Sequence, residues 1–397
     1  MLKIAWRNIL RNKRRSLLSL VLILISVAVL FLLKGYFSAT YDGLELMAIN
    51  QYSHLQIAKE GFWDEGSEER KILSSQDINK IAKVLDAKEE VIDYTNTLEI
   101  AGILGTEDRS TIVSGMGIET DDGQNLEIKS GTKLFAGDET KVIVGEGVRK
   151  KLHLKVDDWV SIMATTIDGA YNAGSLQLSG SFSVGNDDAD SHYIMMPLSF
   201  AQTMLNTDGV DNFKVTLSDT DLTESLIQEL EGEFKREGLA VELRSWRDLA
   251  NFYHQVKGLY DTAFFFLSIL VFILIFMSIL EIMSMSFFER MGEIGTIRAI
   301  GTRRSQVFVQ LIEEALILGI IGGIIGVACG WGTGVIINNL NITYTPPSSG
   351  EVPLYIKLAL NNGIIPFLIV IMVTTLSALY PALKASRLKV VEMLRHV

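Results

Sequence analysis

Cysteine and histidine, which build many disulfide frameworks and metal sites, are scarce or scattered in this sequence. The chain has one cysteine, Cys329, which lies in an apolar run, so neither a disulfide framework nor a site of several thiolates can form within it. Its five histidines are scattered, and no two are four residues apart, the spacing that puts two metal ligands on one helix face. We therefore expect no metal site in this chain.

The sequence also lacks the motifs of common catalytic sites. No G-x-x-x-x-G-K-[ST] segment is present, so the chain cannot hold ATP phosphates in a P-loop, and no G-x-S-x-G segment marks a nucleophile elbow. The acidic run Asp187, Asp188 and Asp190 lacks EF-hand spacing, and we expect a solvated turn between two strands there rather than a calcium loop. These absences indicate a protein without enzyme activity and without a cofactor of its own.

Charge of one sign dominates the middle of the chain. Residues 38–260 hold 39 of the 47 acidic residues but only 20 of the 36 basic ones, in a chain whose net charge is −11. An acidic central domain argues against nucleic-acid binding, which depends on neutralising phosphates. The mean hydropathy of +0.28 is high for a chain with 21% charged residues, and it indicates membrane spans combined with a polar domain.

Four apolar runs are long enough to cross about 30 Å of hydrocarbon as helices. The predicted spans are residues 16–37, 262–286, 307–335 and 358–380. Residues 1–15 contain six basic residues and no acid, which predicts a cytoplasmic amphipathic N-terminus on the membrane surface. The run that follows is longer than the apolar core of a signal peptide, and no clear cleavage site follows it, so we expect an uncleaved first span.

The charges between the spans predict the topology. The segment 287–306 and the tail 381–397 are basic and are expected in the cytoplasm with the N-terminus, which leaves residues 38–260 and the loop 336–357 outside. The predicted fold class is therefore an α-helical membrane protein with four transmembrane helices and an α+β extracytoplasmic domain inserted between the first two. Membrane lipids are its expected surroundings.

The large domain shows two strand–helix–strand patterns, one near each end. They are predicted at residues 54–59, 77–87 (capped by Ser75) and 91–98, and at residues 213–218, 222–236 and 239–245. Between them lies a mostly β insertion, at about residues 99–206, with strands predicted at 110–117, 141–145, 159–166, 176–184 and 193–196 and helices at 147–152 and 199–205. Two subdomains are therefore expected. Flanking apolar stripes, Phe37, Tyr41, Leu44 and Ala48 and then Leu249, Phe252, Tyr253, Val256 and Leu259, predict a helical stalk, although simple extensions of the spans would look the same.

The cytoplasmic segment 287–306 contains the main candidate site. Apolar residues recur at helical spacing with charged residues between them, and a glycine ends the pattern. We expect an amphipathic coupling helix that shows its apolar ridge to the cytoplasm as a docking surface. The candidate residues are Glu289, Arg290, Met291, Glu293, Ile294, Ile297, Arg298, Ile300 and Gly301.

The third span contains an unusual number of glycines, which a soluble helix would hardly tolerate. They are Gly319, Gly322, Gly323, Gly326, Gly330 and Gly334, and several are four apart. In lipid, such a smooth face lets helices approach closely, either within the chain or across a dimer. Glu281, Glu313 and Glu314 lie in or near spans, where they could reach water or arginines at the membrane surface, or could form interhelical pairs or a proton relay.

The string ERMGEIGTIRAIGTRRSQVFVQLIEEALILGIIGGIIGVACG at residues 289–330 resembles the signature of FtsX/MacB-type ABC transporter permeases, E-R-x-x-E-I-G-x-x-R-A-x-G followed by a glycine-rich span. The tail YPALKASRLKVVEMLR resembles the family's C-terminal pattern, with Val390 where proline is common. Segments of the large domain are similar to the extracytoplasmic domain of MacB-type proteins. The resemblance implies that ATP and magnesium are bound by a separate ATPase, present in two copies, and that a second permease, identical or homologous, completes the complex.

Within this family, the layout is most similar to the LolC/LolE permeases that release lipoproteins, because macrolide exporters carry a fused ATPase domain. The implied function is mechanotransmission in a bacterial inner (cytoplasmic) membrane, with a lipoprotein or a periplasmic carrier as a further partner. The alternatives are an FtsX-like signalling permease that regulates a cell-wall hydrolase, which usually has a smaller external domain, and export of another small amphiphile.

Overall fold

The structure is a computed structural model that describes residues 7, 11, 13–64, 70–119, 126–135, 137–185, 187–344, 352–388 and 390–394. The chain divides into two compact units, which are described separately. The helical unit comprises Met1–Gly43, Gln255–Thr343 and Pro353–Val397, and the sheet unit comprises Leu44–His254 and Tyr344–Val352.

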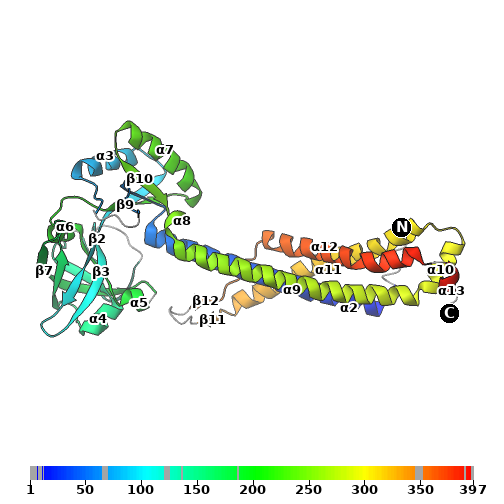
Figure 1. The fold of residues 1–397 in the computed structure, drawn as a ribbon. Helices are drawn as coiled ribbons and strands as arrows, with labels where there is room; N and C mark the ends of the chain where they lie inside the picture. Colours follow the sequence, from blue (N-terminus) through cyan, green and yellow to red (C-terminus); the bar gives the residue numbers. More distant parts are fainter. Residues whose placement is uncertain are drawn as a thin grey trace. The chain divides into compact units, whose positions relative to one another are not determined.

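Four long helices form the helical unit, and each is apolar enough to cross a membrane (Figure 1). They are α2 (Lys13–Tyr52), α9 (Asn251–Glu289), α11 (Arg304–Asn339) and α12 (Asn361–Arg387). Their most apolar windows have mean hydropathies of 2.1 to 3.0, which confirms the prediction of four membrane-spanning helices. Side chains from all four helices share one apolar core, which includes Ile23, Ile275, Leu318 and Val370. The last helix continues through Pro381, where the predicted span stops.

Two short helices close one end of this unit. Helix α10 (Met291–Ala299) connects α9 to α11, and α13 (Val390–Leu394) lies beside it (Figure 1). A separate apolar cluster holds this end together, formed by Phe287, Met291, Ile294, Val307, Leu311, Ala382, Ala385 and Met393. The connector is therefore packed against its own chain on one side.

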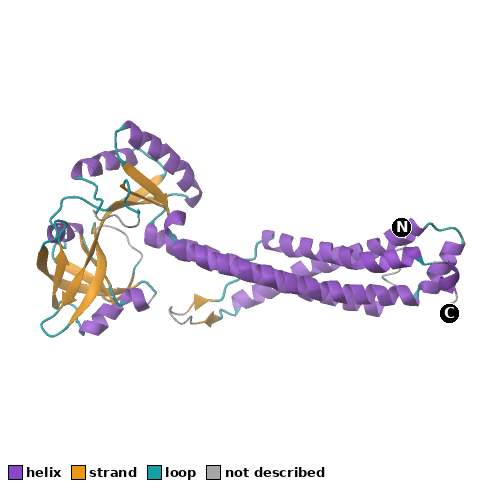
Figure 2. Cartoon of the chain, in the orientation of Figure 1, coloured by secondary structure: helices purple, strands orange, loops and turns teal. Residues whose placement is uncertain are grey.

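The sheet unit is built on one continuous ten-stranded sheet with helices on it (Figure 2). Its strands are β1 (Leu55–Lys59), β2 (Val91–Gly105), β3 (Ser110–Ile118), β4 (Glu127–Gly131), β5 (Lys141–Gly145), β6 (Trp159–Thr165), β7 (Tyr171–Ser183), β8 (Tyr193–Pro197), β9 (Asn212–Leu217) and β10 (Val241–Ser245). The order is β10-β1-β9-β2-β3-β8-β5-β7-β4, and β6 pairs with β2 and β7. The mixed α and β content confirms the predicted α+β class.

Strand β2 joins the two halves of this sheet. Residues 91–97 pair with β9, whereas residues 97–105 pair with β3 and the last four also pair with β6. The β9 half covers a core beneath α3 (Ser75–Leu85) and α7 (Thr223–Arg236). The β3 half covers a second core with α4 (Glu146–Leu152) and α6 (Leu198–Leu205). The predicted strand ended at Leu98, but β2 passes residue 99, where the insertion was expected to begin, without a break.

Local details differ from the predictions in three places. The cap of α3 is Ser74 rather than Ser75, because the residue three positions before Asp77 can exchange hydrogen bonds with it in a capping box. Strand β4 was not predicted. The acidic run forms a one-turn helix, α5 (Asp187–Asp190), instead of a solvated turn. Its last carboxylate is buried and accepts hydrogen bonds from Val184 N at 2.8 Å and from the Ser183 hydroxyl at 2.5 Å.

Helices α2 and α9 each have residues in both units, and in each unit these residues contact one another. In the helical unit, the rings of Phe37 and Tyr260 stack with centroids 4.9 Å apart. In the sheet unit, Ala48 packs with Tyr253 beside Trp246 of α8 (Trp246–Leu249). The second predicted stripe is partly wrong, since Phe252 and Leu259 are 67% and 65% exposed. The chain leaves helical geometry at Ala250, between α8 and α9, so Leu249 and the residues after Ala250 do not share one helical register.

Candidate functional site

Helix α10 begins and ends at sharp changes of direction. Glu289 is the last residue of α9 and is exposed, and Arg290 is the N-cap residue of α10. At the other end, Gly301 has φ +114°, a backbone conformation that glycine adopts without the strain of a side chain. The N–H groups of Gly301 and Thr302 donate to the carbonyls of Arg298 and Ile297 and so close the last turn. The result is a nine-residue helix held between two long ones.

The inner face of α10 is buried against its own chain. Met291 and Ile294 are only 6% and 7% exposed, and both lie in the cluster with Val307, Leu311 and Met393. The prediction that both residues form part of an open docking ridge is therefore wrong. A spacing of three residues advances about 300° around a helix, so an i, i+3 series drifts by about 60° at each step. Over three steps it reaches the opposite face.

The outer face of α10 carries a different set of residues. Glu293, Ile297 and Ile300 are 50%, 49% and 83% exposed, and Thr296 is exposed as well. These four positions follow the i, i+3, i+4, i+7 pattern that places side chains on one helix face. We call them the outer face of α10. The outer face of α10 includes Glu293 and two of the four apolar residues predicted for the docking surface, Ile297 and Ile300. Thr296 also lies on this face, although the sequence pattern did not predict it.

A buried ion pair ties the start of α10 to α11. The Arg290 guanidinium lies 3.2 and 3.3 Å from the two carboxylate oxygens of Glu314, and their side chains are 11% and 7% exposed. Gln310 donates to the same carboxylate. Of the alternatives weighed for Glu314, the structure shows an interhelical pair with a neighbouring arginine, on a side chain that is buried from water. Glu281 is exposed, and Glu313 is half-buried with a carboxylate oxygen, Oε2, that has no partner in the described part of the chain.

The two charged residues expected to orient a partner have contacts within the chain. Glu293 forms an ion pair with Arg11 and lies 3.7 Å from Arg290. Arg298 donates to the carbonyl of Leu388 at 2.6 Å and is partly buried. Arg298 therefore fixes the C-terminal segment rather than facing outward, while half of the Glu293 side chain stays open to a partner.

Two family models match this chain. The FtsX-like permease C-terminal model matches residues 265–390, and the MacB-like periplasmic core domain model matches residues 16–233, more than half of the sequence. The chain belongs to the MacB/FtsX-type family of ABC transporter permeases. The first match contains α10 and its buried ion pair, and the second contains most of the sheet unit.

Relatives match this permease over different lengths. A macrolide export ATP-binding/permease protein MacB from Bdellovibrio bacteriovorus is 34% identical over 118 residues, which cover 30% of this chain and 16% of that protein. A MacB from Azoarcus sp. is 25% identical over 351 residues, covering 84% of this chain and 51% of that protein. The periplasmic region of MacB from Actinobacillus actinomycetemcomitans is 18% identical with a TM-score of 0.37, covering 50% of this chain and 92% of that structure. This permease therefore spans about half or less of the two full-length relatives.

The glycines of α11 lie against other helices of the same chain. A Cβ added at Gly322, Gly326 or Gly330 would come within 2.6 to 3.0 Å of α2, whose facing residues are Ile23, Val27 and Phe31. At Gly319 and Gly323 the neighbours are Thr374 and Phe367 of α12, and at Gly334 the neighbour is Leu358. Of the two possibilities left open by the sequence, packing within the chain is the one that the structure shows at these positions.

Metal ligands do not gather anywhere in the described residues. Among them, no group of three or more His, Cys, Asp or Glu side chains has the arrangement to hold an ion. At the α10 end, the described residues present a face with two exposed isoleucines, Thr296 and a Glu293 carboxylate that is paired with Arg11 and lies near Arg290. Such a face can bind a protein partner, and its burial pattern could not be obtained from periodicity alone.

Proposed function

We propose that this permease converts ATP-driven motion of a partner ATPase into motion of its sheet unit, and that the outer face of α10 is where the ATPase docks. The observation that carries the proposal is the exposure of Ile297 and Ile300 on a short helix whose opposite side is locked to α11. In the proposed topology, α10 and both termini are cytoplasmic, in a bacterial inner membrane, and the sheet unit lies outside.

The energetics favour these two isoleucines as the anchors. Fully burying one exposed isoleucine contributes roughly 1.5–3 kcal/mol. Since Ile297 is already half-buried and Ile300 is 83% exposed, burying what remains of the two contributes about 2–4 kcal/mol. A loss of that size weakens binding at least about thirtyfold. Glu293 is paired with Arg11 within the chain, so it can orient a basic partner surface only by exchanging or sharing that pair.

The buried ion pair gives this docking face a mechanical role. Since Arg290 and Glu314 are both nearly inaccessible, a displacement of α10 is passed to α11 rather than absorbed by a loose connector. The apolar cluster at Met291 and Ile294 adds a second link between the two helices. ATPase closure would then move a long helix that packs against α2 along its glycine face.

The docking proposal is tested by copurification. Ile297→Asp, Ile300→Asp and the double variant are expressed in native membranes, and the ATPase that copurifies with each is quantified by mass spectrometry. Val391→Asp is the matched control, because Val391 is 68% exposed on the adjacent α13 but lies outside the outer face of α10. Ile294→Asp would be ambiguous, since it puts a charge into the buried cluster. Wild-type ATPase recovery with the double variant would contradict the proposal.

For the cargo, we propose lipoprotein release, with two ATPase copies, a second identical or homologous permease, and a lipoprotein or its periplasmic carrier as partners. The support is the layout of four spans with one large domain, which is similar to LolC/LolE permeases. Depletion of the permease should leave outer-membrane lipoproteins in the inner-membrane fraction. Unchanged lipoprotein sorting would favour the alternatives, which are FtsX-like control of a wall hydrolase and export of another small amphiphile. The relatives named as macrolide exporters are consistent with the second alternative.

A further inference from the structure

One face of the sheet unit carries a group of side chains that the proposed function does not use. Along β2, Leu98 and Ile100 point into the core beneath α6, so Glu99 and Ala101 point to the opposite face. Glu99 pairs with Met116 of β3, and Ala101 pairs with Ser114, which in turn pairs with Tyr193 of β8. The register therefore places these residues together on one side of three adjacent strands.

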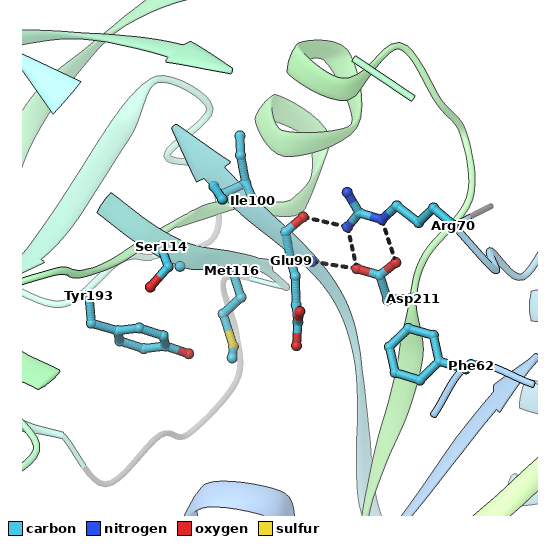
Figure 3. Close-up of a pocket in the computed structure, with 10 residues that line it drawn as sticks. Phe62, Arg70, Glu99, Ile100, Ser114, Met116, Tyr193 and Asp211 are labelled. Carbon is cyan, nitrogen blue, oxygen red and sulfur yellow. Dashed lines mark hydrogen bonds and ion pairs between the residues drawn. The ribbon is translucent and has the colours of Figure 1, made fainter. Parts of the chain in front are cut away.

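This face is hollowed into a cavity of about 500 Å³ (Figure 3). Its lining includes an aromatic and thioether wall, from Phe62 and Met116, and the polar side chains of Ser114, Tyr193 and Glu99. Ligand pockets in proteins typically measure about 300–1,000 Å³ and combine an apolar lining with a few convergent polar groups. In size and composition the cavity resembles a site for a small molecule.

An ion pair at the edge of the cavity fixes the strand that carries Glu99. Arg70 forms a fork with Asp211, with nitrogen–oxygen distances of 3.0 and 2.5 Å, and the Asp211 side chain is only 1% exposed. The same Arg70 donates to the carbonyl of Glu99, and Asp211 accepts the Glu99 N–H at 2.6 Å. Arg70 and Asp211 neutralise each other, so neither is left to attract an anion or a cation strongly.

The Glu99 carboxylate, unlike that of Asp211, is not part of an ion pair with Arg70. Figure 3 shows its side chain extending from the strand into the space beside Met116 and Phe62. Within the described residues, no hydrogen bond or ion pair reaches this carboxylate. Glu99 is exposed at the open side of the cavity, and partial desolvation of its carboxylate raises its pKa. The Asp211 carboxylate raises the pKa further, against the opposing charges of Arg70 and Lys214. The Lys214 ammonium donates to the carbonyl of Gln51 and lies 3.8 Å from the Met116 sulfur. A bound positive charge would stabilise the ionised form of Glu99.

We propose that this cavity binds a small organic cation, with its ammonium or guanidinium group on the Glu99 carboxylate and its apolar body against Phe62 and Met116. Figure 3 shows the Tyr193 and Ser114 side chains on the other side of Met116 from Glu99, where their hydroxyls can bind polar groups elsewhere on the molecule. A hard metal ion fits poorly, because calcium and magnesium take six or more oxygen ligands. Of the two carboxylates that line this cavity, Asp211 is already paired with Arg70, which leaves the Glu99 carboxylate, two hydroxyls and a thioether. An anion would be repelled by the Glu99 carboxylate, and Arg70, which also lines the cavity, is neutralised by Asp211.

The test compares three probes of one shape and different charge: benzylammonium, benzyl alcohol and benzoate. Binding to the full chain in lipid nanodiscs is measured by ligand-observed NMR at pH 7. Benzylammonium should bind at least tenfold more tightly than the other two. Its affinity should fall as the pH is lowered through the raised pKa of Glu99, starting at a higher pH than for an ordinary glutamate.

Variants locate the binding. Glu99→Gln keeps the shape of the side chain and should lose the preference for the cation, whereas Glu107→Gln, at an exposed position in the turn between β2 and β3, should keep it. Ala101→Trp fills the cavity while leaving Glu99 in place and should abolish binding. Equal binding of the three probes to the wild-type chain, or cation-selective binding that survives both Glu99→Gln and Ala101→Trp, would overturn the proposal.

Discussion

A single methyl group at Gly326 should loosen the packing of α11 against α2. A Cβ built at this position would lie 2.7 Å from the Cβ of Val27 and 3.0 Å from the carbonyl oxygen of Leu24. Carbon atoms in contact are normally about 3.5–4.0 Å apart. Both neighbours are main-chain atoms or carbons attached directly to the main chain, so no side-chain rotation relieves the clash, and the two helices must separate by about 1 Å.

The free-energy cost of Gly326→Ala comes from the packing between α2 and α11 that this separation disrupts. Overpacking of a closely fitted interior costs typically about 1–3 kcal/mol. In lipid, close packing is itself the main attraction between helices, so we expect Gly326→Ala to fall in the upper half of that range. Gly330→Ala should cost less, because its nearest neighbours, the Phe31 ring at 3.0 Å and the Ala28 Cα and Phe31 Cβ at 3.2 Å, are farther away than those of Gly326. Gly332→Ala is the control, since nothing lies within 4 Å of its added Cβ and alanine favours helix by about 1 kcal/mol.

The assay is thermal unfolding of the purified chain in nanodiscs, followed by loss of the monodisperse peak on size-exclusion chromatography. The expected order of midpoints is Gly332→Ala at or above wild type, then Gly330→Ala, then Gly326→Ala several degrees below. If Gly326→Ala unfolded at the same temperature as Gly332→Ala, the close approach of α2 and α11 would be refuted as a source of stability.

Three further predictions concern other parts of the chain. Arg290→Met should destabilise the α10 end by about 3–5 kcal/mol in chemical unfolding, because it leaves Glu314 buried without its partner, and Arg290→Met combined with Glu314→Leu should recover much of that loss. The hydrogen bond from Arg149, with help from Ser181, lowers the pKa of Glu146 to about 2. Water screens this near-surface pair, so Glu146→Gln should reduce stability by about 1–2 kcal/mol at pH 7, less than the full shift would give. The difference should vanish as the pH falls from about 4.5 to about 2, and an equal loss at pH 7 and pH 2 would exclude this cause. With the native cysteine replaced, an impermeant thiol reagent should label Asp168→Cys in cells with a permeabilised outer membrane and spare Ser305→Cys, whereas equal labelling would contradict the proposed topology.

The sequence was most informative where one physical pattern acts alone. Long apolar runs predict the four spanning helices, since hydrocarbon leaves the backbone no other way to satisfy its hydrogen bonds. The short apolar runs at residues 141–145 and 193–196 predict β5 and β8 closely. The predicted strand stopped at residue 98 although β2 continues to Gly105, because Gly102 and Gly105 weaken a strand pattern. Gly102 is needed where β6 passes close by. A Cβ at Gly102 would lie 2.3 Å from the Met163 carbonyl oxygen.

Burial at the α10 end could not be predicted because it depends on segments distant in sequence. Met291 and Ile300 have similar local sequence environments, yet one is 6% and the other 83% exposed. The difference is set by Met393 and α11, which cover only one side of the helix. The cavity at Glu99 is also a product of pairing between β2, β3 and β8. The alternation of Thr95, Thr97 and Glu99 places these residues on one face of β2, but it does not show which residues of other strands lie beside them.

The most direct test of the central claim, that the outer face of α10 docks an ATPase, is site-specific photocrosslinking in intact cells. A benzophenone amino acid is placed at Ile300 on the outer face and, as the matched position on the inner face, at Met291. Irradiation followed by mass spectrometry identifies what each position touches. We predict that the probe at Ile300 captures an ATP-binding subunit and that the probe at Met291 captures only residues of this chain. Crosslinks from Ile300 to lipid or to this chain alone would contradict the account.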